Sequence, residues 1–194
     1  MAVLTYSTRH NQVGYLQKSS KIHGFDQILT FLNHSYIRYA LSCNTTVYDS
    51  LVKQFWHTAI AETLPNGIKQ IRVTIDNVAY IVTEATIREC LHLNDASGDF
   101  NLSHSFLVEG MKYIGYPIGT SLKFLQRNLS PHWRFLVHHL LQCLSSKSGG
   151  WDQFDTKIAS ALICLALGRT FNFSKLIFTG MVANVKDSHK FLIF

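Results

Sequence analysis

Histidine and cysteine are the residues of this chain whose spacing could hold a metal ion. Among ten histidines, His138 and His139 lie in a segment with helical periodicity, and Cys143 follows one turn after His139. A helix would therefore present His139 and Cys143 to a shared ion. However, His139 falls on the apolar stripe of that helix, no third ligand stands at a useful spacing, and Cys90 and His92 would point apart on a helix. We interpret His139 as a packed side chain and predict no metal site.

Nucleophilic catalysis and phosphate binding would need motifs that are missing here. Residues 145–148 form a polar Ser-Ser-Lys-Ser run that fits no serine-enzyme motif. The pair Gly149-Gly150 lacks the following Lys-Ser/Thr of a phosphate-binding loop, and no Gly-x-Gly-x-x-Gly run follows a predicted strand. Glu84 and Glu89 are predicted to lie on an exposed helix face. The sequence therefore predicts no enzymatic activity, no cofactor and no small-molecule substrate.

Basic residues are unevenly distributed, which makes nucleic acid a partner to consider. Residues 61–110 carry three Lys/Arg and seven Asp/Glu, whereas residues 111–194 carry ten and three. The candidate contacts for a polyanion are Lys112, Lys123, Arg127, Arg134, Lys147 and Lys157, interleaved with Tyr113, Tyr116, Phe124 and Trp133. No RNP1-like run, zinc knuckle or arginine-rich tract accompanies them, so a solvated face is the favoured interpretation. Trp133 and Phe135 are predicted to belong to the core.

Composition limits the class of protein. The 194 residues are 47% hydrophobic and 15% charged, which is enough apolar material for a core and excludes a disordered chain. No apolar run approaches the ~20 residues of a membrane span. Residues 1–12 lack the order of a signal peptide, and the four cysteines contain no Cys-x-x-Cys pair. We predict an intracellular protein with reduced cysteines and no membrane span.

Apolar periodicity predicts helices along most of the chain. The predicted helices cover residues 25–32, 36–41, 47–60, 83–91, 103–114, 131–144, about 155–168 and 175–185. Their predicted N-caps include Thr83, Ser103 or Ser105, Ser130, Asp152 or Asp155, and Ser174. The helix through residues 158–167 is the most apolar, so we expect it to be the central buried one.

The hydrophobic period changes to two in the middle of the chain. Residues 70–75 and 78–82 are alternating or β-branched and flank Asp76-Asn77, which predicts an antiparallel hairpin over about 69–82. Pro65 and Gly67 are predicted to end the preceding helix. The predicted fold class is mainly α: a single helical domain over residues 23–194 with one small antiparallel β-hairpin. Residues 1–22 show no period and are predicted to form a loosely attached arm.

Several stretches resemble a domain of plant retrotransposon-related polyproteins. They are residues 8–11, 24–28, 39–41, 54–59, 87–88, 91–95, 115–116, 133–138, 142–145, 147–154, 171–175 and 180–182. The order helix, hairpin, helix between Leu51 and Leu93 is also similar to plant mobile-domain and transposon proteins. Such a region is a gag-side or accessory module, apart from protease, integrase and reverse transcriptase.

The resemblance implies a non-enzymatic binding or assembly module that could associate with itself. Two alternatives remain open: a weak nucleic-acid-binding module, and a longin-like vesicle-trafficking adaptor, a label that relatives also carry. The residues give the longin label little support, because a longin domain begins with a strand-rich, five-stranded α/β module. Residues 191–194, Phe-Leu-Ile-Phe, follow a charged segment. They either dock in a groove of this domain or are the severed start of a further element, and we favour the severed element.

Overall fold

The computed structural model describes residues 26–43, 46–118, 124–145 and 152–186. Of these described residues 56% are helical and 16% are strand, so the described part is mainly α, as predicted. The helices are α1 (Asp26–His34), α2 (Arg38–Ser42), α3 (Asp49–Thr58), α4 (Glu84–Cys90), α5 (His104–Tyr113), α6 (Pro131–Leu144), α7 (Thr156–Ala166) and α8 (Phe173–Lys186), with a short 3-10 helix η1 (Gln126–Asn128). The strands are β1 (Ile60–Thr63), β2 (Lys69–Ile75), β3 (Val78–Val82), β4 (Phe124–Leu125) and β5 (Gln153–Phe154).

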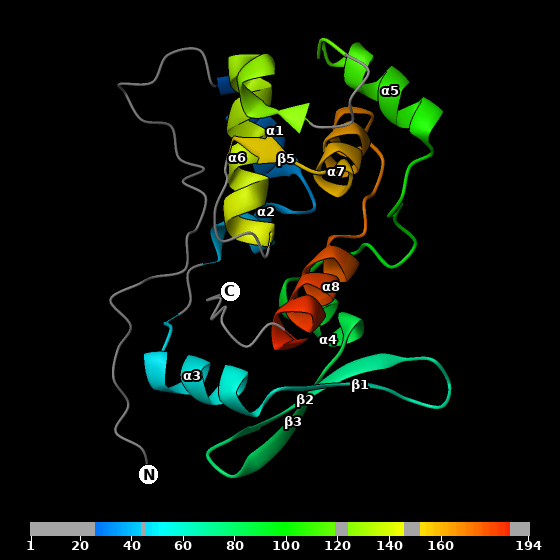
Figure 1. Ribbon diagram of the computed structural model, residues 1–194. Helices are drawn as coiled ribbons and strands as arrows, with labels where there is room; N and C mark the ends of the chain where they lie inside the picture. The colour runs from blue at the N-terminus through cyan, green and yellow to red at the C-terminus, as the bar shows by residue number, and fades with distance from the viewer. Residues whose placement is uncertain (1–25, 44–45, 119–123, 146–151, 187–194) are drawn as a thin grey trace.

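The main sheet lies at one end of the molecule, together with some of the helices. Figure 1 shows β1, β2 and β3 at the foot of the structure, below α4 and α8, with α3 beside them. The helices α5, α6 and α7 lie at the other end. Helix α7 packs against α5 and α6, and every residue from Ile158 to Leu165 is buried, which confirms it as the central helix.

Side-chain caps account for where several helices begin. Thr83 accepts a hydrogen bond from the backbone N–H of Thr86 at the start of α4, and Ser103 does the same at the start of α5. Asp155 accepts from two backbone N–H groups of α7. The predicted cap Thr83 is confirmed, and of the predicted alternatives Ser103 or Ser105 and Asp152 or Asp155 the structure shows Ser103 and Asp155. At α6, Ser130 makes no side-chain cap bond, and the helix begins instead with a proline at its first position.

The cap of the last helix differs from the prediction. The side-chain oxygen of Asn172 accepts from the backbone N–H of Lys175 at 2.8 Å, so Asn172 satisfies the start of α8. Ser174, the predicted cap, lies inside the helix. Its hydroxyl donates a hydrogen bond to the buried carboxylate of Asp95, in the loop that follows α4. The serine is thus used for tertiary contact rather than for capping.

The main sheet has three strands where the sequence predicts a hairpin of two. The helix predicted to run to Ile60 ends at Thr58, and residues 60–63 form β1, which pairs antiparallel with β2. Pro65 and Gly67 lie in the turn between these strands, and Gly67 has a φ of 81°. The same Pro/Gly signal therefore closes a hairpin instead of stopping a helix, because the chain on both sides of it is extended.

The predicted hairpin itself is confirmed. Strand β2 pairs antiparallel with β3 in the register Ile75↔Val78, Val73↔Tyr80 and Ile71↔Val82. Asp76 and Asn77 form its two-residue turn with φ values of 48° and 65°. Two consecutive positive φ angles are the signature of a type I′ turn, whose twist matches that of the flanking strands.

Two sequence predictions concern residues outside the described part of the chain: the arm at 1–22 and the apolar tail at 191–194. Both stay predictions. Within the described residues, no helix has the length and apolar character needed to cross a membrane.

Candidate interaction surface

The six basic residues predicted as polyanion contacts are scattered over the structure. Lys112 is exposed on α5, and Arg127 is exposed on η1. Lys123 and Lys147 lie outside the described residues. The remaining two, Arg134 and Lys157, make side-chain contacts with other residues of the chain.

Arg134 in α6 turns its guanidinium back onto the chain. It donates hydrogen bonds to the backbone oxygens of Gln126 at 3.2 Å, Arg127 at 3.0 Å and Leu129 at 3.2 Å. These bonds tie η1 to the start of α6. The neighbouring Trp133 and Phe135 are half-buried and pack against the core, in line with their predicted role.

Lys157 lies in a compact contact with the loop before α5. Its Nζ donates to the side-chain oxygen of Asn101 at 2.9 Å and lies 3.8 Å from the ring centroid of Phe100. Lys175 approaches the same ring at 4.7 Å. Burial lowers the pKa of Lys157, and the charge of Asp155 opposes that shift. A polyanion would have to compete with these contacts, so the predicted nucleic-acid surface stays a prediction.

His139 occupies a packed position on α6. Its Nδ1 lies 2.8 Å from the backbone oxygen of Phe135, and the two rings are 4.0 Å apart between centroids. Burial lowers the pKa of His139, with a smaller contribution in the same direction from His138. Cys143 is half-buried one turn further on. Among the described residues no group of three His, Cys, Asp or Glu side chains is arranged to hold a metal ion.

A buried ionic network joins α4, the loop after it and α8. Asp95 is fully buried and accepts hydrogen bonds from Arg88 Nε at 2.8 Å and from the backbone N–H of Ser174 at 2.8 Å. The Ser174 hydroxyl donates to the same carboxylate, at 2.8 Å to one oxygen. Arg88 also pairs with Glu84, which in turn accepts from the side-chain nitrogen of Asn172 at 3.0 Å. Arg88 is shared by the two carboxylates, and the neutral donors of Asn172 and Ser174 complete the bonds that hold α4 and its following loop to α8.

The sequence did not predict this network, and the network shows that the predicted exposure of Glu84 is wrong. Glu84 was expected on an exposed helix face together with Glu89; Glu89 is exposed, but Glu84 is half-buried because the start of α8 covers it. Arg88, Asp95 and Ser174 belong to stretches that carry the resemblance to plant polyproteins, at 87–88, 91–95 and 171–175. Their place in these stretches is the one feature of the sequence that could have singled them out. Asp95 and Ser174 are separated by 79 positions, so spacing alone could not join them.

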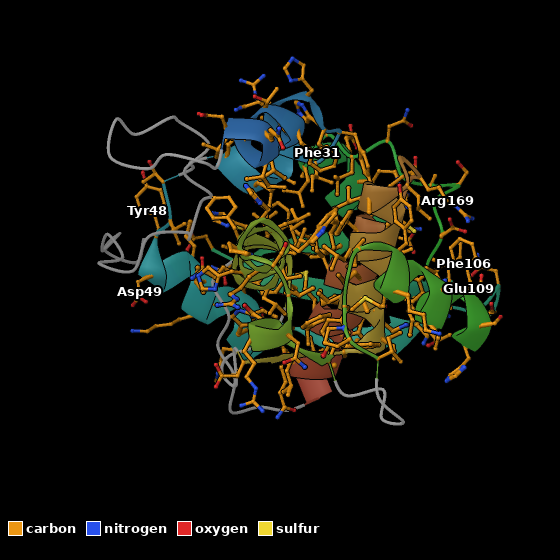
Figure 2. The ribbon with its side chains drawn as sticks, turned by 90° about the horizontal axis from the view of Figure 1, so that it is seen from above. Phe31, Tyr48, Asp49, Phe106, Glu109 and Arg169 are labelled. Carbon is orange, nitrogen blue, oxygen red and sulfur yellow. The ribbon has the colours of Figure 1, made fainter. Side chains whose placement is uncertain are left out.

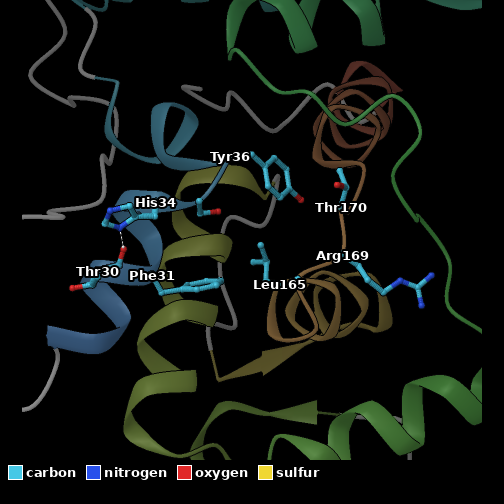
Figure 3. A pocket seen from close by; sticks show the side chains of 9 residues that line it. Thr30, Phe31, His34, Tyr36, Leu165, Arg169 and Thr170 are labelled. Carbon is cyan, nitrogen blue, oxygen red and sulfur yellow. Dashed lines mark hydrogen bonds between the residues drawn. The ribbon is translucent and has the colours of Figure 1, made fainter.

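An open cleft lies between α1 and the end of α7. Figure 3 shows the side chains of Phe31 and Leu165 facing each other across it, in a volume of about 440 Å³. A second cleft of about 360 Å³ shares these two residues and extends toward Trp133 on α6. His34 at the rim is engaged, with its Nδ1 2.8 Å from the backbone oxygen of Thr30.

Arg169, at the other rim of this cleft, is directed away from it. Its Nη2 pairs with Asp99 Oδ2 at 2.8 Å, and its guanidinium lies 5.1 Å from the ring centroid of Phe106. Figure 2 shows Arg169 and Phe106 on the same flank of the molecule, apart from Phe31. The cleft is therefore an apolar groove whose charged neighbour is already paired.

No protein-family model, no curated protein and no solved structure matches this chain.

Exposed apolar side chains concentrate on the three-stranded sheet. Nine large hydrophobic residues of the described chain are exposed, and five of them belong to the sheet and its turns: Ile60, Ile68, Val78, Tyr80 and Ile81. On β3 the exposure runs along the first four of its five residues, with Val78 at 51%, Tyr80 at 49% and Ile81 at 46%. Strand order is β1-β2-β3, so β3 is an edge. We take this strand and its free side as the candidate interaction surface.

The two faces of the sheet differ around β3. Ile71 and Val73 of β2 are buried in the core; on β3, Val82, the partner of Ile71, is partly buried against the core, whereas Tyr80, the partner of Val73, is exposed. On the opposite face, Arg72 lies between Ile60 of β1 and Ile81 of β3 in the pairing register.

Glu62 of β1 compensates the charge of this arginine. Arg72 donates to Glu62 Oε1 at 2.7 Å, and Gln70 donates to Oε2 of the same carboxylate at 3.0 Å. The bonds from Gln70 and Arg72 lower the pKa of Glu62. The charges of this face are thus paired on the β1 side, and the β3 side is apolar.

Proposed function

We propose that this chain is a non-enzymatic assembly module of the kind found in plant retrotransposon-type polyproteins, and that it associates with itself. The observation that carries the proposal is the concentration of exposed apolar side chains on the sheet, where five of the nine exposed large hydrophobics of the described residues lie. Apolar patches of this kind mark interaction sites on proteins.

The edge strand supports the proposal further. Proteins protect free strand edges with charges, prolines, bulges or covering segments, because an unprotected edge pairs with other chains. The sequence of β3, Val-Ala-Tyr-Ile-Val, contains no charge and no proline, and its residues are exposed along most of its length. An edge with this composition is suited to binding.

The polar residues of the described chain support a non-enzymatic role. The most buried carboxylate, Asp95, is saturated by Arg88 and Ser174. Asp95 therefore serves the fold, and its carboxylate is not available to a substrate as an acid or base.

Salt dependence separates assembly from nucleic-acid binding. The chain carries a formal net charge of +6, so two copies repel each other, and added salt should strengthen an apolar self-contact by screening that repulsion. Binding to a polyanion would weaken with salt, by a slope that reflects the phosphates neutralised.

The experiment is sedimentation velocity of the full chain over a wide range of concentration, at about 50 and 200 mM salt. We expect the weight-average sedimentation coefficient to rise with concentration and to rise more steeply at the higher salt. A chain that stays monomeric at all concentrations contradicts the proposal. Tight binding of single-stranded RNA at low salt, lost at high salt, would assign the chain to the nucleic-acid class instead.

A further inference from the structure

We propose that two copies of this chain join through antiparallel pairing of their β3 strands, with Tyr80 of one copy opposite Tyr80 of the other. The two three-stranded sheets would then form one continuous sheet in the order β1-β2-β3-β3-β2-β1. This inference rests on the proposed self-association and names the surface and geometry that produce it.

The hairpin turn determines which backbone groups of β3 are free. Asp76 and Asn77 form a two-residue type I′ turn, so the flanking residues Ile75 and Val78 are a hydrogen-bonded pair. Hydrogen-bonded and non-bonded pairs alternate along an antiparallel ladder. Tyr80 therefore bonds to β2, whereas Ala79 and Ile81 direct their N–H and C=O groups away from it.

Among the symmetric registers that these free groups allow, one pairs the whole strand. When Tyr80 faces Tyr80 of the second copy, Ala79 faces Ile81 in both directions, and each such pair can exchange both backbone bonds. All five residues of β3 are then paired, from Val78 opposite Val82 to Val82 opposite Val78. Because the arrangement has two-fold symmetry, one surface serves both copies.

The side chains are compatible with this register on both faces. One face joins the rows Val78, Tyr80 and Val82 of each copy, and the other joins Ala79 to Ile81. All of these side chains are uncharged, so pairing places no like charges directly opposite each other within the strands. Aromatic and β-branched residues are also the types that favour cross-strand pairs.

Helix α3 leaves this edge open. The hydroxyl of Thr58, at the end of α3, accepts from the backbone N–H of Thr74 at 2.9 Å and donates to the backbone oxygen of the same residue. Gln54 bonds the turn at Asp76. Thr58 lies two residues before β1 in the chain, so these contacts lie on the β1 side of β2 and leave the far side of β3 to a partner.

The available area predicts a weak, reversible contact. The exposed halves of Val78, Tyr80 and Ile81 amount to roughly 300 Å² per copy, given the size of such side chains. A standard stable interface buries about 800 Å² on each partner. Association should therefore appear at high concentration, where several weak contacts can act together in an assembly.

The decisive test is a symmetric disulfide. In a Cys90→Ser background, which removes the exposed native thiol, Tyr80→Cys would place two thiols at a non-hydrogen-bonded pair, with Cα atoms about 4.5 Å apart. Disulfides need about 4.4–6.8 Å. Ala79→Cys is the matched control, because its two copies would lie roughly 8–9 Å apart in this register. Under mild oxidation, intact-mass analysis should show dimer forming at least tenfold faster for Tyr80→Cys than for Ala79→Cys.

A second pair of variants keeps the test valid if the cysteine weakens the strand. Ile81→Glu adds a charge to β3, while Ile60→Glu adds one to β1, and both positions are about half exposed and neighbour Arg72. We expect Ile81→Glu to raise the dissociation constant at least tenfold and Ile60→Glu to leave it within a factor of two or three of wild type.

The outcomes separate the two proposals. If the chain associates but the cysteines at 79 and 80 cross-link equally, or Ile60→Glu and Ile81→Glu weaken association alike, the β3 pairing is wrong and assembly stands. If the wild-type chain does not associate in sedimentation, both are wrong.

Discussion

Removing the carboxylate of Asp95 should be among the most destabilising single changes in this protein. Asp95 is 0% exposed and accepts from Arg88 Nε, from the Ser174 N–H and from the Ser174 hydroxyl. Asp95→Ala would leave these donors without their acceptor at a junction that holds α4 and its following loop to α8.

The expected cost follows from what is left unpaired. Breaking a buried ion pair from one side costs about 3–5 kcal/mol, and a buried donor without a partner costs about 1–3 kcal/mol. Arg88 keeps Glu84 and is 21% exposed, so its share lies at the lower end. We expect a loss of about 4 kcal/mol, which for a chain of this size lowers the melting temperature by roughly 8–16 °C.

The assay is urea unfolding followed by circular dichroism, with an unchanged m value as the sign that both states keep their compactness. Asp49→Ala is the matched control, since it removes a carboxylate paired at 2.7 Å with Lys53 on the surface. It should cost less than about 1 kcal/mol. Asp95→Asn, which keeps an acceptor but no charge, should fall between them. If Asp95→Ala costs no more than Asp49→Ala, the junction does not have the role assigned to it.

Three further predictions address packing and titration. Burial lowers the pKa of His139 below its ordinary value of 6.5, so on acidification the unfolded chain takes up the proton first, and stability should fall as the pH drops below about 6.5. The variant His139→Gln should flatten this part of the plot of urea midpoint against pH. An unchanged slope would contradict the prediction. Burial raises the pKa of Cys164 to about 12. Alkylation at pH 8, read by peptide mass spectrometry, should therefore label exposed Cys90 in the native state and Cys164 only after unfolding. Rapid labelling of Cys164 in the native state would refute its burial. A Cβ at Gly110 would lie 2.5 Å from Ile163 Cγ2, so Gly110→Ala should destabilise the fold by about 1–3 kcal/mol in urea unfolding. In an Ile163→Ala background, part of that loss should disappear. If the losses of the two single variants simply add in the double variant, α5 and α7 do not meet at this point.

The sequence predicted correctly those features that depend only on residues close together in the chain. Thr83, Ser103 and Asp155 cap the helices they were expected to cap, because an N-cap depends on backbone groups within a few residues. The Asp76-Asn77 turn was predictable for the same reason, since short polar residues tolerate the positive φ that a type I′ turn requires.

The errors arose where tertiary pairing decides the local structure. Ile60 fits the apolar stripe of a helix, yet it belongs to β1 because β2 offers a partner strand across the Pro65-Asn66-Gly67 turn. Ser174 has the chemistry of a cap, but Asp95 captures its hydroxyl, and Asn172 takes the capping position. Neither outcome can be seen within one sequence window.

The candidate surface could be anticipated only in part. The alternation of residues 78–82 predicts β3, but its exposure depends on which strand lies at the edge of the sheet, and that depends on the unpredicted β1. The basic residues were visible in the sequence, whereas the folding of Arg134 onto η1 and of Lys157 onto Phe100 required the three-dimensional structure.

Amide hydrogen exchange along β3 tests assembly through this edge most directly. Residue-resolved NMR exchange should be recorded at low and at high protein concentration, where the copies associate. At low concentration the amide of Tyr80, bonded to β2, should be protected, and those of Ala79 and Ile81 should exchange rapidly. Raising the concentration should slow Ala79 and Ile81 together and leave the turn residue Asn77 unchanged. If Ala79 and Ile81 exchange equally fast at both concentrations while the chain associates, the β3 edge is not the contact.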